Sequence, residues 1–482
     1  MKRFFIISLL MLLWLPLPGE ESAPQILVHL SGLTGEEGDR LADIGLTIPG
    51  LPAPEQTLLV SAGQLLQLRE LGIPARVLPR PESEANILRP GYMDVAAIEA
   101  LSDSLVGAFP NLVRKEVYGI SVEGRELFAL KISDNVHRDE NEPEVGFDGC
   151  HHGDEALSAE VLMRMVRQMC LAYGKDAYLS SLIDEREIWV FPVVNPDGRE
   201  TLDRRNARGV DLNRDWGYMW DAWGGSNTPY SQPETRAALS WLLDHQFAVL
   251  QSLHAGMEMI SYPWSYSPHD SPDHQAIESL AQGYVNNSHY PELSHGPGFK
   301  NLYPINGNAK DSYYGIRGAL GWTMELGAEK MPPAERINHF YDKNLPAMLH
   351  LIDAAGLGIS GTVRSSLTGL PLAATVWVSR AGEDFWPVYS DPENGAFHKY
   401  LAPGNYRVRV SANGYLSASG EEIVVGERGA AHRDFYLEEG GGFFAHQVLA
   451  CRIPGNNHAD NGLTYQTLGE PDGRGYSLGR AG

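Results

Sequence analysis

Cysteine is scarce in this chain of 482 residues, which contains only Cys150, Cys170 and Cys451. A disulfide framework needs more cysteines, and an odd number leaves at least one thiol unpaired. A chain of this length also buries a large core without covalent cross-links. We therefore expect a globular protein in which Cys150 and Cys170 are small buried side chains rather than the two halves of a bridge.

Positive charge is also in short supply. The chain carries 38 Lys and Arg residues against 61 Asp and Glu residues, so its formal net charge at pH 7 is -23. Nucleic acids and anionic membrane surfaces are bound through basic patches. The charge balance therefore argues against both as partners.

Long apolar runs are missing from the sequence after its beginning. There, Lys2 and Arg3 precede an apolar run from Phe4 to Leu15, which is too short to span a bilayer. A basic start followed by such a run is typical of a secretion signal. We expect residues 1–22 to be a signal peptide, so that the mature protein is secreted, extracellular or periplasmic, without stable membrane insertion. An uncleaved anchor is the alternative, because Ser22-Ala23 is not a clean cleavage site.

Composition and periodicity divide the rest of the chain into four parts. Residues 23–91 are typical of a small α+β unit, either a pro-segment or a packing domain, with a proline-containing linker near its end. In residues 92–356 strands alternate with helices, which predicts an α/β domain with a mixed, mostly parallel sheet flanked by helices. Residues 357–439 show short strands between turns, as in a small antiparallel β-sandwich. Residues 440–482 are Gly-rich and indicate a tail or an incomplete β-domain.

Polar residues stand where the expected strands of the α/β part end. His152, Asn195, His254 and Glu325 lie at or just after four of these strands. In a sheet of this kind, functional groups collect beyond the carboxyl ends of the strands. We therefore expect these four side chains to lie near one another.

His152 and Glu155 occupy the junction between an expected strand and an expected helix. Imidazole and carboxylate both suit zinc, and a catalytic zinc takes three protein ligands while keeping one position open. A lone pair of this spacing is common by chance. The neighbouring His151 is a competing ligand, so the pair needs support from elsewhere in the chain.

That support comes from four motifs that occur in order within the α/β part. They are His-Gly-Asp-Glu at 152–155, Asp-Leu-Asn-Arg at 211–214, Ser-Leu-His at 252–254 and Thr-Met-Glu-Leu at 323–326. Together they resemble the zinc metallocarboxypeptidase family, the funnelins, over residues 92–356. The β-sandwich that follows resembles the transthyretin-like, or carboxypeptidase regulatory-like, domain often attached to such enzymes.

The resemblance implies a zinc site and a general base. His152, Glu155 and His254 would hold one zinc ion per chain, and strand alternation would point His151 away from its neighbour. Zinc acidifies bound water and polarises the scissile carbonyl. Glu325 would accept the proton of the water and pass it to the leaving amine.

The resemblance also implies residues that bind the substrate. Asn213 and Arg214 would grip its terminal carboxylate, since a guanidinium binds a carboxylate through two hydrogen bonds. Arg204 would steady the oxyanion of the reaction, with Arg205 an alternative one register step away. Tyr303 resembles the mobile tyrosine that covers bound substrate in the family.

Lys310 takes a position that resembles the floor of the family's specificity pocket, and a lysine there favours peptides ending in Glu or Asp. Two departures from the digestive enzymes of the family stand out. Asp154 replaces an arginine, so the secondary substrate contact of that arginine is not implied, and Ala255-Gly256 replaces a bulkier pair. A serine-hydrolase pattern at residues 475–479 has no core strand before it and no helix after it, so we attribute it to the 51 glycines of the chain.

The sequence thus predicts a secreted zinc carboxypeptidase that acts on the C-termini of peptides or proteins. One alternative is an amidase of the same chemistry acting on bacterial cell-wall peptides, which the segment 206–213 resembles equally. Another is a non-catalytic binding protein in which the β-sandwich makes the contacts. The complete set of three ligands and a base argues against this last alternative.

Overall fold

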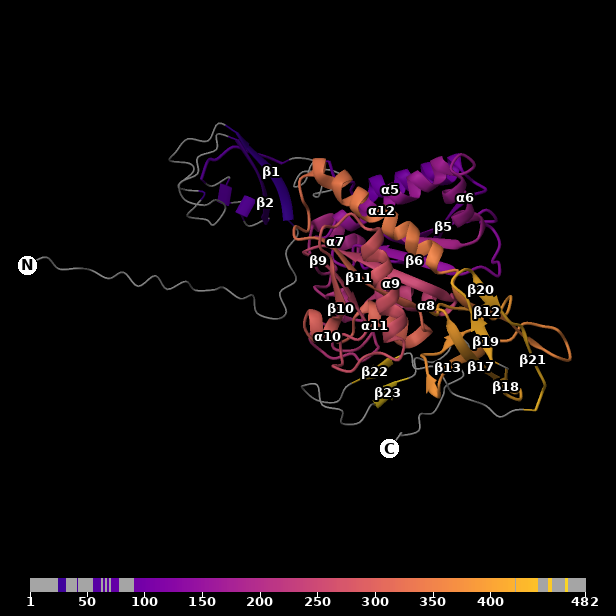
Figure 1. The fold of residues 1–482 in the computed structure, drawn as a ribbon. Helices are drawn as coiled ribbons and strands as arrows, with labels where there is room; N and C mark the ends of the chain where they lie inside the picture. The colour runs from indigo at the N-terminus through magenta and orange to yellow at the C-terminus, as the bar shows by residue number, and fades with distance from the viewer. Residues whose placement is uncertain are drawn as a thin grey trace, which may run out of the picture. The chain divides into compact units, whose positions relative to one another are not determined.

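The computed structural model describes residues 25–31, 41, 55–61, 64–65, 67–68, 71–77, 91–420, 422–440, 450–452 and 464–466. The expected signal peptide, the linker after residue 78 and the pattern at 475–479 lie outside the described residues. The chain divides into two compact units, residues 1–82 and 83–482. The ribbon of both units is drawn in Figure 1.

The first unit contains a three-stranded antiparallel sheet. Strand β1 (Gln25–Ser31) pairs with β2 (Glu55–Ser61) on one side and with β3 (Ala75–Val77) on the other. Helical residues at 64–65 and 67–68 contribute Leu65 and Leu68 to a small core. Strands and helical residues thus occur together here, as expected of a small α+β unit.

The second unit is organised around an eight-stranded sheet in the order β10-β9-β11-β8-β6-β7-β5-β4. These strands are β4 (Val113–Ile120), β5 (Glu126–Ile132), β6 (Glu144–Gly149), β7 (Glu187–Phe191), β8 (Phe247–His254), β9 (Met257–Tyr262), β10 (Ser294–Pro297) and β11 (Leu320–Gly327). The four strands from β11 to β7 run parallel, whereas β9, β5 and β4 join them through antiparallel ladders. The mixed, mostly parallel sheet predicted from the sequence is confirmed.

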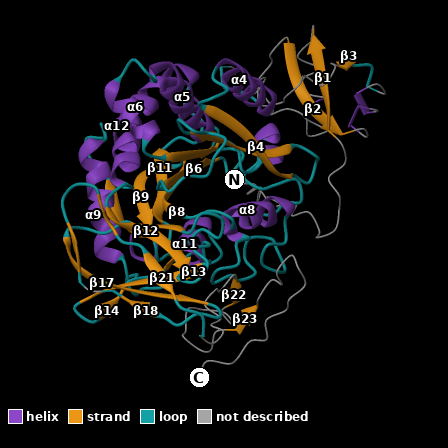
Figure 2. Ribbon diagram, turned by 90° about the vertical axis from the view of Figure 1, so that its right-hand side faces the viewer, coloured by secondary structure: helices purple, strands orange, loops and turns teal. Residues whose placement is uncertain are grey.

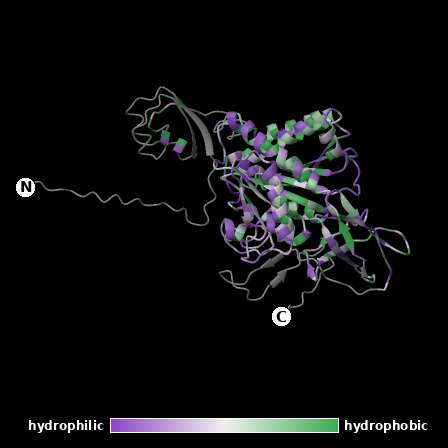
Figure 3. Ribbon diagram, in the orientation of Figure 1, coloured by the Kyte–Doolittle hydropathy of each residue, from purple (hydrophilic) through white to green (hydrophobic). Residues whose placement is uncertain are grey.

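Helices cover both faces of this sheet. Figure 2 shows α5, α6, α9 and α12 on one side and α8 and α11 on the other. The helices are α4 (Val95–Ala108), α5 (Leu157–Ala172), α6 (Ala177–Asp184), α7 (Pro196–Thr201), α8 (Pro233–Leu243), α9 (His274–Asn287), α10 (Gly298–Asn301), α11 (Ala309–Arg317) and α12 (Ile337–Ala354), with 3-10 turns at Leu212–Arg214 and Ala334–Arg336. The central strands are consequently buried on both faces, and Figure 3 shows apolar residues along them.

Two local features show how the sequence sets the bounds of these elements. Asp94 is the N-cap of α4, because its side chain accepts a hydrogen bond from Ala97 N at 2.7 Å. Strand β7 ends at Phe191. Pro192 follows, and a proline has no N–H with which to continue the ladder.

A β-sandwich completes the second unit, with β16-β12-β20 in one sheet and β14-β13-β17-β18 in the other, extended by β21, β15 and β19. Its strands are β12 (Gly358–Ser365), β13 (Ala374–Arg380), β14 (Glu383–Asp384), β15 (Val388–Tyr389), β16 (Ala396–Lys399), β17 (Gly404–Ala412), β18 (Ala418–Ser419), β19 (Ile423–Val425), β20 (Ala430–His432) and β21 (Phe435–Leu437). Most ladders are antiparallel, but β12 pairs with β20 and β21 in parallel. In the Gly-rich end, β22 (Ala450–Arg452) pairs with β23 (Thr464–Gln466).

Two further expectations concern the thiols and the membrane. Cys150 and Cys170 are buried free cysteines, as expected. Within the described ranges, every helix falls short of the length and apolar character needed to cross a bilayer.

Candidate active site

Two histidines and a glutamate meet at the carboxyl ends of β6 and β8. After β6 ends at Gly149, Cys150 adopts a φ of 51° and turns the chain out of the sheet. The turn carries His152 and Glu155 before α5 begins, and β8 ends on His254. All three side chains are buried.

The donor atoms of these three residues converge on one point. His152 Nδ1 lies 2.8 Å from Glu155 Oε1, His254 Nδ1 lies 2.8 Å from Glu155 Oε2, and the two Nδ1 atoms are 3.2 Å apart. Zinc bonds of about 2.0–2.1 Å in tetrahedral geometry separate ligand atoms by roughly 3.3 Å. Two imidazole nitrogens and one carboxylate at this spacing fit a zinc ion bound by three protein ligands.

The protonation states of the group favour metal binding at two of its members. Burial raises the pKa of Glu155, but the charges of His152 and His254 and their hydrogen bonds bring it well below its usual range. Burial lowers the pKa of His254 to about 4 despite the nearby charge of Glu155. For His152, burial is outweighed by Glu155 and Asp211, which raise the pKa. At neutral pH Glu155 is therefore ionised and His254 neutral, the forms that bind metals.

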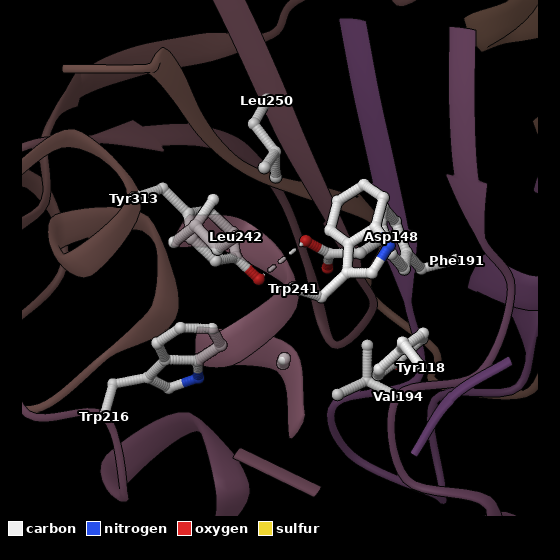
Figure 4. Close-up of a pocket in the computed structure, with 10 residues that line it drawn as sticks. Tyr118, Asp148, Phe191, Val194, Trp216, Trp241, Leu242, Leu250 and Tyr313 are labelled. Atoms are coloured by element: carbon white, nitrogen blue, oxygen red, sulfur yellow. Dashed lines mark hydrogen bonds between the residues drawn. The ribbon is translucent and has the colours of Figure 1, made fainter. Parts of the chain in front are cut away.

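His151 points away from this group. Its Nε2 lies 2.9 Å from Asp148 Oδ1, and Asp148 also accepts hydrogen bonds from Ser252 Oγ at 2.6 Å and Tyr313 OH at 3.0 Å. Figure 4 shows the bond between Tyr313 and Asp148 beside a cavity of about 20 Å³, enough for about one water molecule. The His151 ring stacks on that of His254 with centroids 5.6 Å apart. The structure thus brings His152, and not His151, to the two other donors.

Asp211 is a site residue to which the sequence assigned no role. Its Oδ1 lies 3.2 Å from His152 Nε2, and its Oδ2 accepts a hydrogen bond from Arg204 Nε at 2.9 Å. Burial raises the pKa of Asp211, but the hydrogen bond and charge of His152, with Arg214 and Arg204, bring it well below its usual range. Carboxylates in this position orient metal-binding histidines. The signal was available, since Asp211 opens one of the four motifs.

Arg204, and not Arg205, reaches the group. Arg204 Nη1 lies 3.3 Å from His152 Nδ1 and 3.7 Å from Glu155 Oε1, whereas Arg205 is exposed. Asn195 takes a supporting position instead of joining the donors. Its Oδ1 caps α7 by accepting a hydrogen bond from Gly198 N at 2.9 Å.

Asn213, Arg214 and Tyr303 form a second cluster beside the donors. Asn213 Nδ2 lies 3.4 Å from His254 Nε2, and Arg214 Nη1 donates to Asn213 O at 2.7 Å. Arg214 Nη2 donates to the Tyr303 hydroxyl at 3.3 Å. Tyr303 is 46% exposed although Arg214 is buried. A buried guanidinium therefore donates a hydrogen bond to the hydroxyl of an exposed tyrosine.

Glu325 and Lys310 complete the site. Glu325 is the register partner of His254 across the parallel ladder of β11 and β8. Burial, followed by the charge of Glu155, raises the pKa of Glu325 to about 7. Lys310 is buried in the first turn of α11, where burial lowers its pKa to about 8 although Asp311 opposes this. Within the part of the chain that the structure describes, its ammonium forms no ion pair with a carboxylate, so it is available to an anion.

Asp154 forms an ion pair with Lys330, a contact that the sequence does not predict. Lys330 Nζ lies 2.6 Å from Asp154 Oδ2 and 3.4 Å from Glu155 Oε1. The two residues are 176 positions apart, so no local pattern signals the contact. An acidic residue next to Glu155 thus holds a lysine at the edge of the site.

Comparisons with known proteins find matches for two parts of the chain. The family model described as "Zinc carboxypeptidase" matches residues 98–347, and the one described as "Carboxypeptidase regulatory-like domain" matches residues 358–438. Carboxypeptidase SOL1 of Arabidopsis thaliana is 30% identical over 372 residues, which cover 74% of this chain and 74% of that protein.

One further relative is much longer than this chain, and one solved structure is similar in fold at a low sequence identity. Carboxypeptidase D of Rattus norvegicus is 28% identical over 402 residues, or 72% of this chain but 29% of that protein. The crystal structure of thrombin activatable fibrinolysis inhibitor has a TM-score of 0.52 and 22% identity, covering 68% of this chain and 98% of that one. This structure supports the α/β fold alone, and carboxypeptidase D is several times longer than the matched segment.

Proposed function

This chain belongs to the zinc carboxypeptidase family and is a metallocarboxypeptidase by that membership, and we propose that it removes single C-terminal residues from peptides or proteins with Glu325 as general base. The observation that carries the proposal is the meeting of three metal donors and a carboxyl of raised pKa at adjacent strand ends, beside the buried guanidinium of Arg214. These are the parts that hydrolysis of a terminal peptide bond requires.

His152, Glu155 and His254 would hold one zinc ion per chain, since their donor atoms have the chemistry and spacing of a catalytic zinc site. When bound there, zinc supplies a Lewis acid that polarises the scissile carbonyl and acidifies water. Asp211 keeps the His152 ring oriented through the nitrogen that faces away from the donors.

Recognition of the free C-terminus falls to Asn213 and Arg214. The Arg214 guanidinium is held by Asn213 O at 2.7 Å, so little side-chain freedom remains to be lost when a carboxylate binds. Tyr303 would close over the bound residue, because its hydroxyl already reaches Arg214. This arrangement selects the end of a chain over its interior.

Proton transfer falls to the Glu325 carboxylate. It would accept a proton from the attacking water and deliver it to the nitrogen of the leaving residue. A pKa of about 7 suits both steps, because a general base is most effective near the operating pH. Arg204 would stabilise the negative charge that develops on the carbonyl oxygen.

Lys310 would set the preference for the terminal side chain. Its charge acts on Arg214 and Glu325, so it lies near the place where the terminal residue is held. A buried ammonium there favours peptides ending in Glu or Asp. The net charge of -23 repels such peptides at long range, but salt screens that repulsion beyond roughly 8 Å.

The roles of the other segments of the chain are proposed from the sequence alone. Residues 1–22 would be a signal for secretion, and residues 23–91 a pro-segment or packing domain before the catalytic domain at 92–356. The β-sandwich at 357–439 and a short tail would follow.

A pair of peptides tests the proposal. The zinc-loaded protein should shorten a free peptide by one residue from its C-terminus, as read by mass, and a chelator should stop it. Amidation of the C-terminus should cost roughly 1.5–3 kcal/mol, the worth of one charge-assisted hydrogen bond. Equal cleavage of both peptides would instead support the amidase alternative, and no cleavage of any peptide would support a binding protein.

A further inference from the structure

Trp386 links the β-sandwich to the catalytic sheet. It lies between β14 and β15, and its indole Nε1 donates a hydrogen bond to Gly315 O of α11 at 3.2 Å. Its backbone N donates to Asp273 Oδ2 at 3.0 Å. A single residue of the sandwich is thus bonded to two segments of the catalytic domain.

The Trp386 ring is one corner of an aromatic triangle. Its centroid lies 5.6 Å from that of Trp264, in an edge-to-face arrangement of 81°, and 5.8 Å from that of Tyr314. Trp264 and Tyr314 are themselves 4.9 Å apart. Loss of the Trp386 ring would therefore remove one of the rings on which Trp264 and Tyr314 pack.

A buried ion pair fixes the backbone of Trp386. Lys399 Nζ lies 2.8 Å from Asp273 Oδ1, and these side chains are 1% and 0% exposed. The same ammonium donates to Trp386 O at 2.9 Å, and Tyr314 OH donates to Asp273 Oδ2 at 2.6 Å. A buried ion pair that is satisfied in this way allows one geometry, so the sandwich and the catalytic domain meet in a defined orientation here.

A glycine permits the approach of the two backbones. Gly318 ends α11 with a φ of +74°, and a Cβ on it would lie 2.2 Å from Pro387 O. Any other residue would push Pro387 away from α11. The end of the helix is therefore in direct contact with the segment that carries Trp386.

The segment of Trp264 and helix α11, which both carry rings packed on Trp386, meet next to Lys310. The residue after Trp264, Ser265, donates its backbone N–H to Asp311 Oδ2 at 2.8 Å. Helix α11 carries Lys310 in its first turn, and Ala309 N donates to Asn213 Oδ1 at 2.9 Å. A shift of α11 at Gly315 would consequently move Lys310 relative to the residues that would hold the substrate carboxylate.

We propose that Trp386 is a positioning residue of the specificity pocket: the β-sandwich, through this tryptophan, sets the placement of α11 and hence of Lys310. The inference rests on the proposed function for its meaning. It gives the sandwich a role in choosing which terminal side chain is accepted. It leaves binding of the main chain and the proton transfer to Arg214 and Glu325.

The kinetic test compares Trp386→Ala with Trp377→Ala, a tryptophan of the same domain that packs on Arg409 instead. For each protein, kcat/KM is measured on peptides ending in Glu, Phe, Lys and Gly. The ratio of the preferred ending to Gly should fall roughly 10-fold to 100-fold in Trp386→Ala, as for misplacements of about 1 Å. The Gly-ending peptide, which leaves the pocket empty, and the zinc content should be unchanged. Trp377→Ala should match the wild type.

A structural readout separates this inference from the proposed function. Hydrogen exchange of the α11 amides should be faster in Trp386→Ala than in the wild type, whether or not any peptide is cleaved. Trp386→Phe, which keeps a ring but loses the bond to Gly315 O, should lie between them and serves if the alanine variant does not fold. Unchanged α11 exchange, or an equal fall of the ratio in Trp377→Ala, overturns the inference. A wild type that cleaves no peptide overturns the proposed function alone.

Discussion

Strands β8 and β17 bury their residues in opposite ways. Every residue of β8 is buried, and the strand ends on the polar His254. In β17 buried Tyr406, Val408 and Val410 alternate with the exposed Arg407 and Arg409. The first pattern arises because helices cover both faces of the sheet, and the second because one face of the sandwich meets water.

This difference decides where chemistry can reside. At the end of β8 the side chains are buried, so charges act strongly on one another and shift the pKa values of Glu155, His254 and Glu325. The interior of the sandwich is an apolar cluster that includes Val376, Val408 and Phe397. Changes at the strand ends should therefore alter catalysis, whereas changes in the sandwich core should alter stability.

The largest effect is expected at Glu325. Glu325→Gln keeps the shape of the side chain and removes the base, so kcat should fall roughly 10²-fold to 10⁴-fold with no change in zinc content. Glu329→Gln is the matched control, because Glu329 lies just beyond β11 and its side chain is 55% exposed. A Glu325→Gln enzyme that keeps most of its rate would assign the proton transfer to another group.

A smaller effect is expected at Asp211, because it contacts the Nε2 atom of His152 and not the Nδ1 atom that faces the other donors. Asp211→Asn should weaken zinc affinity roughly 10-fold to 100-fold, since it loosens the orientation of His152. Competition with a chelator measures this affinity without any substrate. Asp203→Asn, at an exposed position of the same segment, should bind zinc as the wild type does. Equal affinities of all three proteins would contradict the role given to Asp211.

Lys310 should make kcat/KM depend on pH for peptides with an acidic C-terminal residue, and not for other peptides. The ammonium is charged below its pKa of about 8 and neutral above it. For peptides ending in Glu, kcat/KM should thus fall roughly 10-fold as pH rises through this value, since a hydrogen bond to a charged group contributes about 1.5 kcal/mol or more. Peptides ending in Phe should not show this fall. Lys310→Met should remove the difference, and a wild-type preference for Phe or Lys would contradict the assignment.

The smallest effect is expected in the sandwich core. Ile359 is 1% exposed, and Ile359→Val should lower the free energy of unfolding by about 0.5–1.5 kcal/mol. Thermal or denaturant unfolding measures the loss, and kcat on the Gly-ending peptide should stay unchanged. Val424→Ala, at a position 69% exposed, is the control and should change stability little. A fall in kcat for Ile359→Val would contradict the expectation that changes in the sandwich core alter stability and not catalysis.

The metal group could be predicted from the sequence because its members stand in short ordered motifs. His152 and Glu155 are neighbours across one turn, and His254 ends a strand whose apolar run is easily recognised. The contact of Lys330 with Asp154 could not be predicted in this way. It joins positions far apart in the chain, and nothing in the local sequence of either residue indicates the other.

The helices and strands also differ in how well the local sequence predicts them. Strand β5 can be predicted from the sequence because its residues form a continuous β-like run. Helix α11 is harder to predict, because it has only nine residues and all of them, including Lys310, Asp311 and Arg317, are buried. Strand β10 has the sequence Ser-His-Gly-Pro, which lacks any β-branched residue. Both elements take their structure from the neighbours that surround them.

The pairing of Glu325 with His254 has a consequence for how the chain can change in length. The two residues face each other because β11 and β8 share one register, and neighbouring strands lie about 4.8 Å apart. One residue inserted between Leu320 and Glu325 would turn the carboxyl to the opposite face of the sheet. We expect insertions and deletions to be rejected within β11, because any change in length there would move the Glu325 carboxyl out of the site.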